Sequence, residues 1–159
     1  MNARDVENER KFLVADDFSP QTEGTSIVQG YFLASDGFSV RVRLYMTLEV
    51  YQLTVKGPRS GISRAEEETA LSRTMAEALL QACGPRIVEK TRYPILGPDG
   101  AAWDVDVFHG ANKGLRLAEL ELNDPMTSFV QPDWCLEEVT NDDRYYNDYL
   151  AAHPYSTWT

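Results

Sequence analysis

The chain has 159 residues, of which 43% are hydrophobic, so it is long enough for one globular domain with a sizeable core. Its formal net charge of −10 argues against a general nucleic-acid binder, which needs a basic surface against phosphates, and no apolar run has the length of a signal peptide or a membrane span. Two cysteines, Cys83 and Cys135, make no disulfide framework, so we expect small buried thiols in a reduced, cytoplasmic protein.

The first predicted element is a strand at residues 6–14 (VENERKFLV). Side chains two apart share one face of a strand but no face of a helix. Glu7, Glu9 and Lys11 therefore lie together on one side of this strand, opposite Asn8, Arg10, Phe12 and Val14. One such run is equally compatible with an ordinary strand whose charged face is in water.

Alternating polar and apolar residues predict the next four strands, at residues 27–34, 39–46, 49–57 and 63–71. Residues 35–38 (SDGF) predict a hairpin turn, because Asp-Gly accepts the positive φ angles of a tight turn. In the strand that follows, Arg41 and Arg43 share one face. Residues 57–61 (GPRSG) are predicted to form a loop, which lacks the spacing of a phosphate-binding P-loop.

The period then changes. Apolar residues recur every 3.6 positions within residues 69–84 and predict an amphipathic helix that ends at Gly84 and Pro85. Three more strands follow, at residues 86–95, 101–110 and 114–122. A last helix is predicted within residues 141–152, with Thr140 or Asn141 as its N-cap.

Eight strands predict a mainly β (α+β) fold, either an antiparallel barrel or a sandwich, with two or three helices packed outside. The charged faces are sorted by sign: acidic in Asp104/Asp106 and Glu119/Glu121, and basic in Arg41/Arg43 and Lys90/Arg92. Like charges two apart on one face repel, and a solvated sheet gains nothing from them. A strongly anionic ligand bound together with metal ions would use both sets.

The charged pairs also form an ordered series of motifs: E-x-E-x-K at 7–11, Q-G-Y at 29–31, R-x-R at 41–43, Lys56, R-x-E-x-E at 64–68, K-x-R at 90–92 and E-x-E at 119–121. This series resembles the CYTH superfamily, the triphosphate tunnel metalloenzymes, and especially its short single-domain bacterial members. The resemblance covers about residues 7–150 of a single predicted domain spanning 1–159. It implies a closed or near-closed eight-stranded antiparallel tunnel with a charged interior, and a segment at 138–147 that covers one tunnel mouth.

The resemblance also implies the roles of the charged residues. The substrate phosphates would be bound by Lys11, Arg41, Arg43, Lys56, Arg64, Lys90 and Arg92. The ligands of Mg²⁺ or Mn²⁺ would be Glu7, Glu9, Glu119 and Glu121, with Glu66, Glu68, Asp104 and Asp106 at a second metal or orienting water. Lys11 and Tyr31 would form the catalytic pair, and we expect neighbouring arginines to lower the pKa of Lys11 so that it acts as a base.

The expected function is metal-dependent hydrolysis of inorganic triphosphate, by attack of water on a terminal phosphoryl group inside the tunnel. A class IV adenylate cyclase and a thiamine triphosphatase are alternatives within the same superfamily. A non-catalytic protein that binds polyphosphate or nucleotide is an alternative of another class, and would keep the arginines without turnover. The expected partner is a small anionic triphosphate, with no nucleic acid and no membrane, and the sequence leaves the oligomeric state open.

Overall fold

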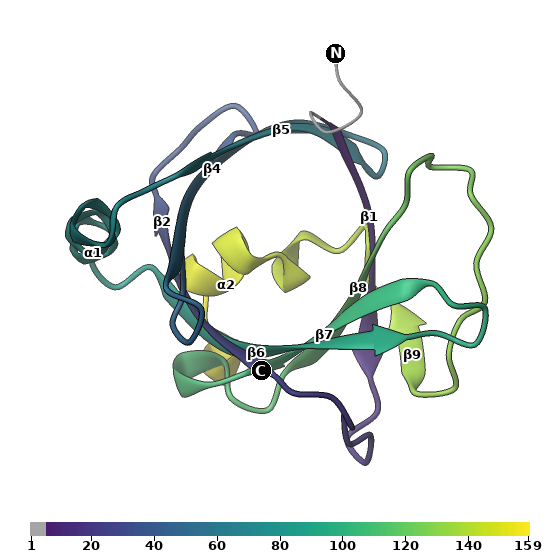
Figure 1. Cartoon of the computed structure of the whole chain (residues 1–159). Helices are drawn as coiled ribbons and strands as arrows, with labels where there is room; N and C mark the ends of the chain where they lie inside the picture. Colours follow the sequence, from purple (N-terminus) through teal and green to yellow (C-terminus); the bar gives the residue numbers. More distant parts are fainter. Residues whose placement is uncertain (1–5) are drawn as a thin grey trace.

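A computed structural model describes residues 6–159 of the chain. In this part the backbone forms nine strands: β1 (Val6–Val14), β2 (Thr25–Phe32), β3 (Ser39–Tyr45), β4 (Val50–Ser60), β5 (Ser63–Ala70), β6 (Ile87–Leu96), β7 (Ala102–Phe108), β8 (Arg116–Glu121) and β9 (Cys135–Glu138). Eight of them pair in the antiparallel order β5-β4-β3-β2-β6-β7-β8-β1, and β1 pairs again with β5. The sheet is therefore a closed barrel, which Figure 1 shows end-on as a ring. The predicted barrel is confirmed.

Strand β1 closes the barrel because its two edges have different partners. One edge pairs with β8, where Lys11 lies opposite Glu119. The other edge pairs first with β5, where Glu7 lies opposite Arg64, and then with β9, where Val14 lies opposite Cys135. Strand β9 is an addition to the eight predicted strands and lies outside the ring beside β1 (Figure 1).

The two α-helices have different positions. Helix α1 (Arg73–Ala82) packs against the outside of β2, β3 and β4, and it begins later than predicted, because the Ser72 hydroxyl caps it by accepting from the Met75 N–H. Helix α2 (Asn147–Ala152) follows a 3₁₀ turn, η2 (Asp143–Tyr145), and lies across the ring in Figure 1. Two further 3₁₀ turns are η1 (Gly110–Asn112) and η3 (Tyr155–Thr157).

Two local predictions about caps and loops are wrong. Thr140 does not cap a helix; its hydroxyl accepts a hydrogen bond from the Lys11 backbone N–H, and Asp142 caps η2. Residues 57–61 are not wholly a loop, since β4 continues to Ser60 through a bulge around Pro58, a position where a strand tolerates proline. The predicted hairpin turn is confirmed, with positive φ angles at Asp36 and Gly37.

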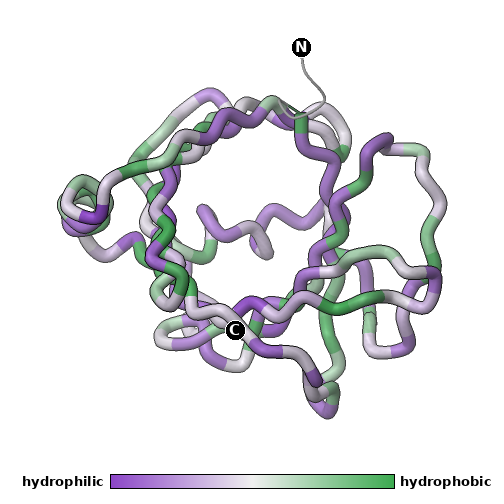
Figure 2. The backbone as a smooth tube through the Cα atoms, in the orientation of Figure 1, coloured by the Kyte–Doolittle hydropathy of each residue, from purple (hydrophilic) through white to green (hydrophobic). Residues whose placement is uncertain are grey.

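The alternation of side chains puts the apolar core on the outer surface of the barrel and polar groups inside it. Phe12, Trp103 and Leu120 are buried on the outer face beneath Phe129 and Trp134 of the segment between β8 and β9. In Figure 2, hydrophilic and hydrophobic residues alternate along the strands of the ring. Of the helices within residues 6–159, none is long and apolar enough to cross a membrane.

Candidate functional site

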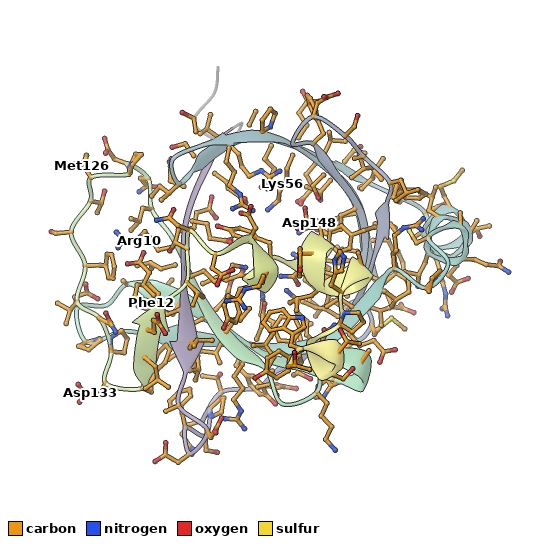
Figure 3. All side chains as sticks on the ribbon, turned by 180° about the vertical axis from the view of Figure 1, so that it is seen from behind. Arg10, Phe12, Lys56, Met126, Asp133 and Asp148 are labelled. Carbon is orange, nitrogen blue, oxygen red and sulfur yellow. The ribbon has the colours of Figure 1, made fainter. Side chains whose placement is uncertain are left out.

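The interior of the barrel holds a cavity of about 340 Å³. All of the predicted site residues line this cavity except Lys90 and Asp106. Figure 3 shows Lys56 and Asp148 inside the ring, while Met126 lies at the periphery. The segment that precedes and begins α2 adds Tyr146, Asn147 and Asp148 to the lining, so this end of the barrel is closed by polar side chains.

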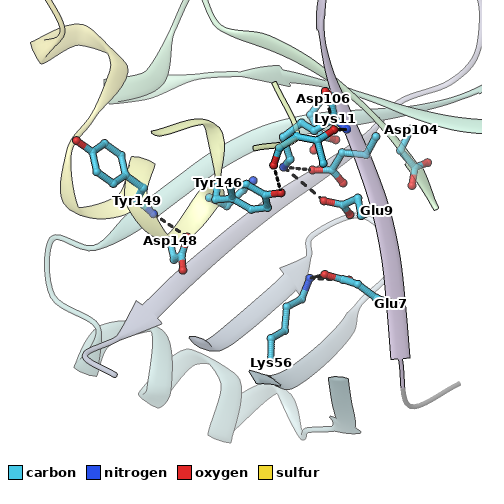
Figure 4. A network of polar contacts seen from close by, with 12 residues as sticks. Glu7, Glu9, Lys11, Lys56, Asp104, Asp106, Tyr146, Asp148 and Tyr149 are labelled. Carbon is cyan, nitrogen blue, oxygen red and sulfur yellow. Dashed lines mark hydrogen bonds and ion pairs between the residues drawn. The ribbon is translucent and has the colours of Figure 1, made fainter. Parts of the chain in front are cut away.

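Strand register brings the charges together. On β1, Glu9 lies directly opposite Glu121 of β8, and Lys11 lies opposite Glu119. The Lys11 ammonium is 2.9 Å from a Glu119 oxygen and 3.6 Å from a Glu9 oxygen. The β1–β8 pairing therefore presents both a matched pair of charges and a repulsive pair of carboxylates to the cavity. Figure 4 shows Lys11 beside Glu9 on β1.

A second group of ion pairs lies farther along β1. The Lys56 ammonium is 2.7 Å from a Glu7 oxygen and 3.5 Å from a Glu66 oxygen. Figure 4 shows the Lys56 side chain reaching across to Glu7 from the facing strand. Without a ligand, these charges of the lining neutralise one another.

Lys90 and Asp106 lie beneath the lining, and their side chains are 0% exposed. The Lys90 ammonium is 2.6 Å from Asp106, and Asp106 also accepts two hydrogen bonds from Arg92. Arg92 in turn donates to Glu119 over 2.7 Å. The buried pair therefore fixes Arg92, which does reach the cavity.

The two interior lysines have pKa values shifted in opposite directions. Burial alone lowers the pKa of Lys11, but the carboxylates of Glu119 and Glu9 raise it well above its ordinary value. Burial lowers the pKa of Lys90 to about 7, with Arg92 and Arg43 acting in the same direction and Asp106 against it. The predicted lowering of the Lys11 pKa is thus wrong, because the register places carboxylates around its ammonium.

The acidic residues fall into two groups. Burial raises the pKa of Glu9 and Glu121, and neighbouring carboxylates raise it further. Glu7 and Asp104 also have raised pKa values, chiefly from burial. Burial acts in the same sense on Glu119, but Lys11 and Arg92 hold the pKa of that carboxyl well below its ordinary value. In the first group, burial and neighbouring carboxylates outweigh the nearby cations, which are Lys56 at Glu7, Lys11 at Glu9 and Arg92 at Asp104. At Glu119 the cations outweigh burial.

The donor set of the first group fits a divalent cation such as Mg²⁺ or Mn²⁺, since these are hard oxygen ligands whose raised pKa values show that their negative charge is not fully compensated. Within residues 6–159, no three or more such side chains are yet gathered closely enough to hold a metal ion. Glu7 is bonded to Lys56 instead. The carboxylates therefore suit a metal chemically, and would have to leave their present partners to bind one.

Three arginines of the lining, Arg41, Arg43 and Arg64, have few acidic partners. Arg41 donates to the Thr54 hydroxyl, lies 3.8 Å from Glu68, and keeps a buried Nε without a partner in the described part of the chain. Arg43 and Arg64 make no ion pair within residues 6–159, and burial lowers the pKa of both. A buried guanidinium without a carboxylate is a ready partner for an anion.

The expected catalytic pair does not form a direct hydrogen bond in the structure of residues 6–159. The Tyr31 hydroxyl accepts from Gln29, while the Lys11 ammonium lies 4.8 Å from the ring centroid of Tyr146. The Arg59 guanidinium also stacks on Tyr146, 3.1 Å from its centroid. Neither Gln29 nor Tyr146 was expected among the site residues, although Gln29 lies in the Q-G-Y motif and Tyr146 in the segment at 138–147 that resembles the family.

Comparison with known proteins gives a consistent result. The sequence model of the CYTH domain family matches residues 5–148. An inorganic triphosphatase of Acetivibrio thermocellus is 40% identical over 154 residues, which cover 96% of this chain and 97% of that protein. An inorganic triphosphatase of Nitrosomonas europaea is 40% identical over 92% of this chain and 97% of its own length. A crystal structure of an inorganic triphosphatase superimposes with a TM-score of 0.67 and 37% identity, covering 91% of this chain and 93% of the other.

Proposed function

The chain belongs to the CYTH domain family, and we propose that it is a divalent-metal-dependent hydrolase that splits inorganic triphosphate. The two inorganic triphosphatases that are 40% identical to it match over nearly its whole length. The charged cavity supports the same conclusion from the chemistry of its own side chains.

One observation carries this proposal: the same cavity holds buried arginines that make no ion pair within residues 6–159, and carboxylates whose pKa values stay raised in spite of the cations near them. A triphosphate is strongly anionic, so it would take the guanidinium groups of Arg41, Arg43 and Arg64, with Lys56 and Arg92 at its flanks. An uncharged ligand would leave both sets of charges unpaired.

Glu7, Glu9, Glu121 and Asp104 are the proposed metal-holding residues, with Glu66 and Glu68 beside them in the lining. Glu119 would bind metal only by giving up Lys11 and Arg92, so its first role is to orient those two cations. Asp106 and Lys90 act from beneath by fixing Arg92. A bound divalent cation would supply positive charge to the phosphoryl oxygens.

Lys11 and Tyr31 are the proposed catalytic residues, and both act as hydrogen-bond donors. The raised pKa keeps Lys11 as an ammonium, which stabilises negative charge that develops on a phosphoryl oxygen but does not deprotonate water. Burial likewise raises the pKa of Tyr31 and keeps its hydroxyl protonated. The proposed chemistry is therefore electrostatic stabilisation by a preformed lining.

We also propose that the chain acts as one domain in the cytoplasm. Its two cysteines, Cys83 and Cys135, are free and buried, as is usual for thiols in a reducing compartment.

The experiment is phosphate release from tripolyphosphate, with ATP and thiamine triphosphate as competing candidates, in Mg²⁺, in Mn²⁺ and in EDTA. We expect hydrolysis of tripolyphosphate that requires metal, and a loss of about 10²-fold or more in Glu9→Gln. The matched control is Glu77→Gln, which removes the same charge from the exposed face of α1. Undiminished hydrolysis in EDTA, or an equal loss in both variants, contradicts the proposal.

A further inference from the structure

Gln29 of β2 has a buried, uncharged side chain that connects three parts of the barrel interior. It is 0% exposed and lies opposite Arg43 in the β2–β3 pairing, two residues before Tyr31 on the same face of the strand. Its side chain is within hydrogen-bond distance of Arg43, Tyr31 and Asn147. It therefore links the arginines of the cavity to the segment that closes it.

The orientation of the Gln29 amide is determined by Arg43. The Arg43 Nε can only donate a hydrogen bond, and the Gln29 atom 2.8 Å away must therefore be the oxygen, Oε1. The other amide atom is Nε2, which has two hydrogens. One points at the Tyr31 hydroxyl over 2.9 Å, and the other at the Asn147 Oδ1 over 2.8 Å.

The consequence for Tyr31 concerns its proton. The Tyr31 oxygen accepts a hydrogen bond from Gln29, and the positive charges of Arg41 and Arg43 also lie close to it. An oxygen surrounded by donors turns its own hydrogen away from them. Since Tyr31 lines the cavity, its O–H is left to donate to a ligand there.

The consequence for Asn147 concerns which end of its amide meets the cavity. Its Oδ1 accepts from Gln29 and also from the Lys90 ammonium, 3.0 Å away, and Lys90 can make this bond in either charge state. Both donors hold the oxygen on the buried side. Asn147 lines the cavity, so the group that remains to face it is the NH₂.

We propose that Gln29 is a positioning residue that fixes the polarity of Tyr31 and Asn147, so that both present hydrogen-bond donors to a phosphoryl oxygen in the cavity. This inference rests on the proposed function, because it assigns further contacts to the same triphosphate. It explains why the Tyr31 hydroxyl donates, and it adds one neutral donor, the Asn147 NH₂ of the closing segment. The buried Gln29 amide thereby holds Asn147 of the closing segment and the phosphate-binding Arg43 in fixed positions relative to each other.

The test replaces the hydrogen-bond donor of the Gln29 side chain with an acceptor, in a side chain of nearly the same shape. Gln29→Glu keeps an acceptor for Arg43 but offers oxygen to Tyr31 and draws the tyrosine proton away from the cavity. We expect Tyr31→Phe to lower kcat/KM for tripolyphosphate about tenfold or more in the wild type and less than about threefold in the Gln29→Glu background. A purely structural Gln29 predicts the same factor in both backgrounds, and that result overturns the proposal.

Two further variants control for charge and for folding. Gln29→Met is neutral and donates nothing, so kcat/KM should fall between wild type and Gln29→Glu. Asn147→Asp keeps the acceptor for Lys90 and Gln29 but replaces the NH₂ with oxygen, so KM should rise about tenfold or more without loss of melting temperature. If Gln29→Glu does not fold, the Asn147→Asp result decides, and an unchanged KM overturns the proposal.

Calorimetric titration with tripolyphosphate and Mg²⁺ separates this inference from the proposed function. A wild-type chain that binds tripolyphosphate without hydrolysing it refutes the proposed hydrolase. The same series of variants then tests Gln29 through affinity instead of rate, with the same expected order. A wild-type chain that neither binds nor hydrolyses tripolyphosphate overturns both.

Discussion

Removing the charge of Glu9 should stabilise the unliganded protein, whereas removing the charge of Glu119 should destabilise it. Glu9 faces Glu121 across the β1–β8 pairing, and its pKa is raised by burial and by nearby carboxylates. Glu119 accepts from Lys11 and Arg92, which hold its pKa well below the ordinary value against the effect of burial. The two residues lie on neighbouring strands, β1 and β8, and we expect their charges to have opposite effects on the stability of the fold.

The magnitudes follow from these environments. Directly opposed like charges in a sheet cost up to about 1 kcal/mol, so Glu9→Gln should raise Tm by about 2–4 °C in a chain of this size. Glu119 is 11% exposed, and losing one partner of a buried pair costs about 3–5 kcal/mol, so Glu119→Gln should lower Tm by about 6–20 °C. Both variants should lose hydrolysis.

The pH dependence has a definite sign for each residue. The folded-state pKa of Glu9 is raised, so its penalty is absent below the ordinary value of 4.5 and complete above the raised value. The Tm gain of Glu9→Gln should therefore be present at pH 8 and vanish as the pH falls toward 4.5. Glu119 has a lowered folded-state pKa, so its stabilisation is complete above 4.5 and is lost only as the pH falls through that lower value.

Thermal melting of wild type, Glu9→Gln and Glu119→Gln in EDTA from pH 4 to pH 8 measures these effects. Changes of the same sign in both variants at pH 8, or a Glu9→Gln gain that persists at acid pH, would refute the assignment of unpaired and paired carboxylates.

Three other predictions concern the ligand, the lysine and the thiols. Tripolyphosphate with Mg²⁺ should raise Tm of the wild type, and inorganic phosphate with Mg²⁺ should raise it much less, because only the longer anion reaches both sides of the cavity; equal shifts would contradict this. Lys11→Ala should lower kcat about 10²-fold, and Lys11→Arg should retain more activity, since arginine still donates but cannot act as a base; equal losses would return Lys11 to the role of base. Burial raises the pKa of Cys135 to about 12 and also raises that of Cys83, so iodoacetamide at pH 8 should modify neither in the native protein and both in denaturant, as mass spectrometry would show.

The strands and the composition of the cavity were predictable, because alternate side chains of a strand lie on the same face and the sequence shows which residues alternate. Glu7, Glu9 and Lys11 face the cavity for this reason alone. Strand β9 escaped prediction because its four residues are too few for a periodic signal. The strand through Pro58 was mistaken for a loop because proline and glycine there mark a bulge.

Pairing across strands could not be read from the sequence, and it determines the electrostatics. The arginines expected around Lys11 are present in the cavity, but the register puts Glu119 directly opposite it and reverses the expected pKa shift. Lys90 shares a face with Arg92 yet lies deeper, where Asn147 from a distant segment covers it. Gln29 belongs to the Q-G-Y motif, but its role could not be predicted, because that role comes from its three partners in the fold.

The double pairing of β1 has a consequence for the order of folding. This strand is synthesised first, but its partners on β8 come much later, and 108 residues separate Lys11 from Glu119. The β2–β3 and β4–β5 hairpins join strands that are neighbours in the chain, and β1 can pair with β5 before β8 is made. The other edge of β1 must wait for β8. Closing so long a loop is slow, because its entropy is lost before the contacts are gained. We therefore expect the β1–β8 pairing, where Lys11 lies opposite Glu119 and Glu9 opposite Glu121, to be the last part of the ring to close.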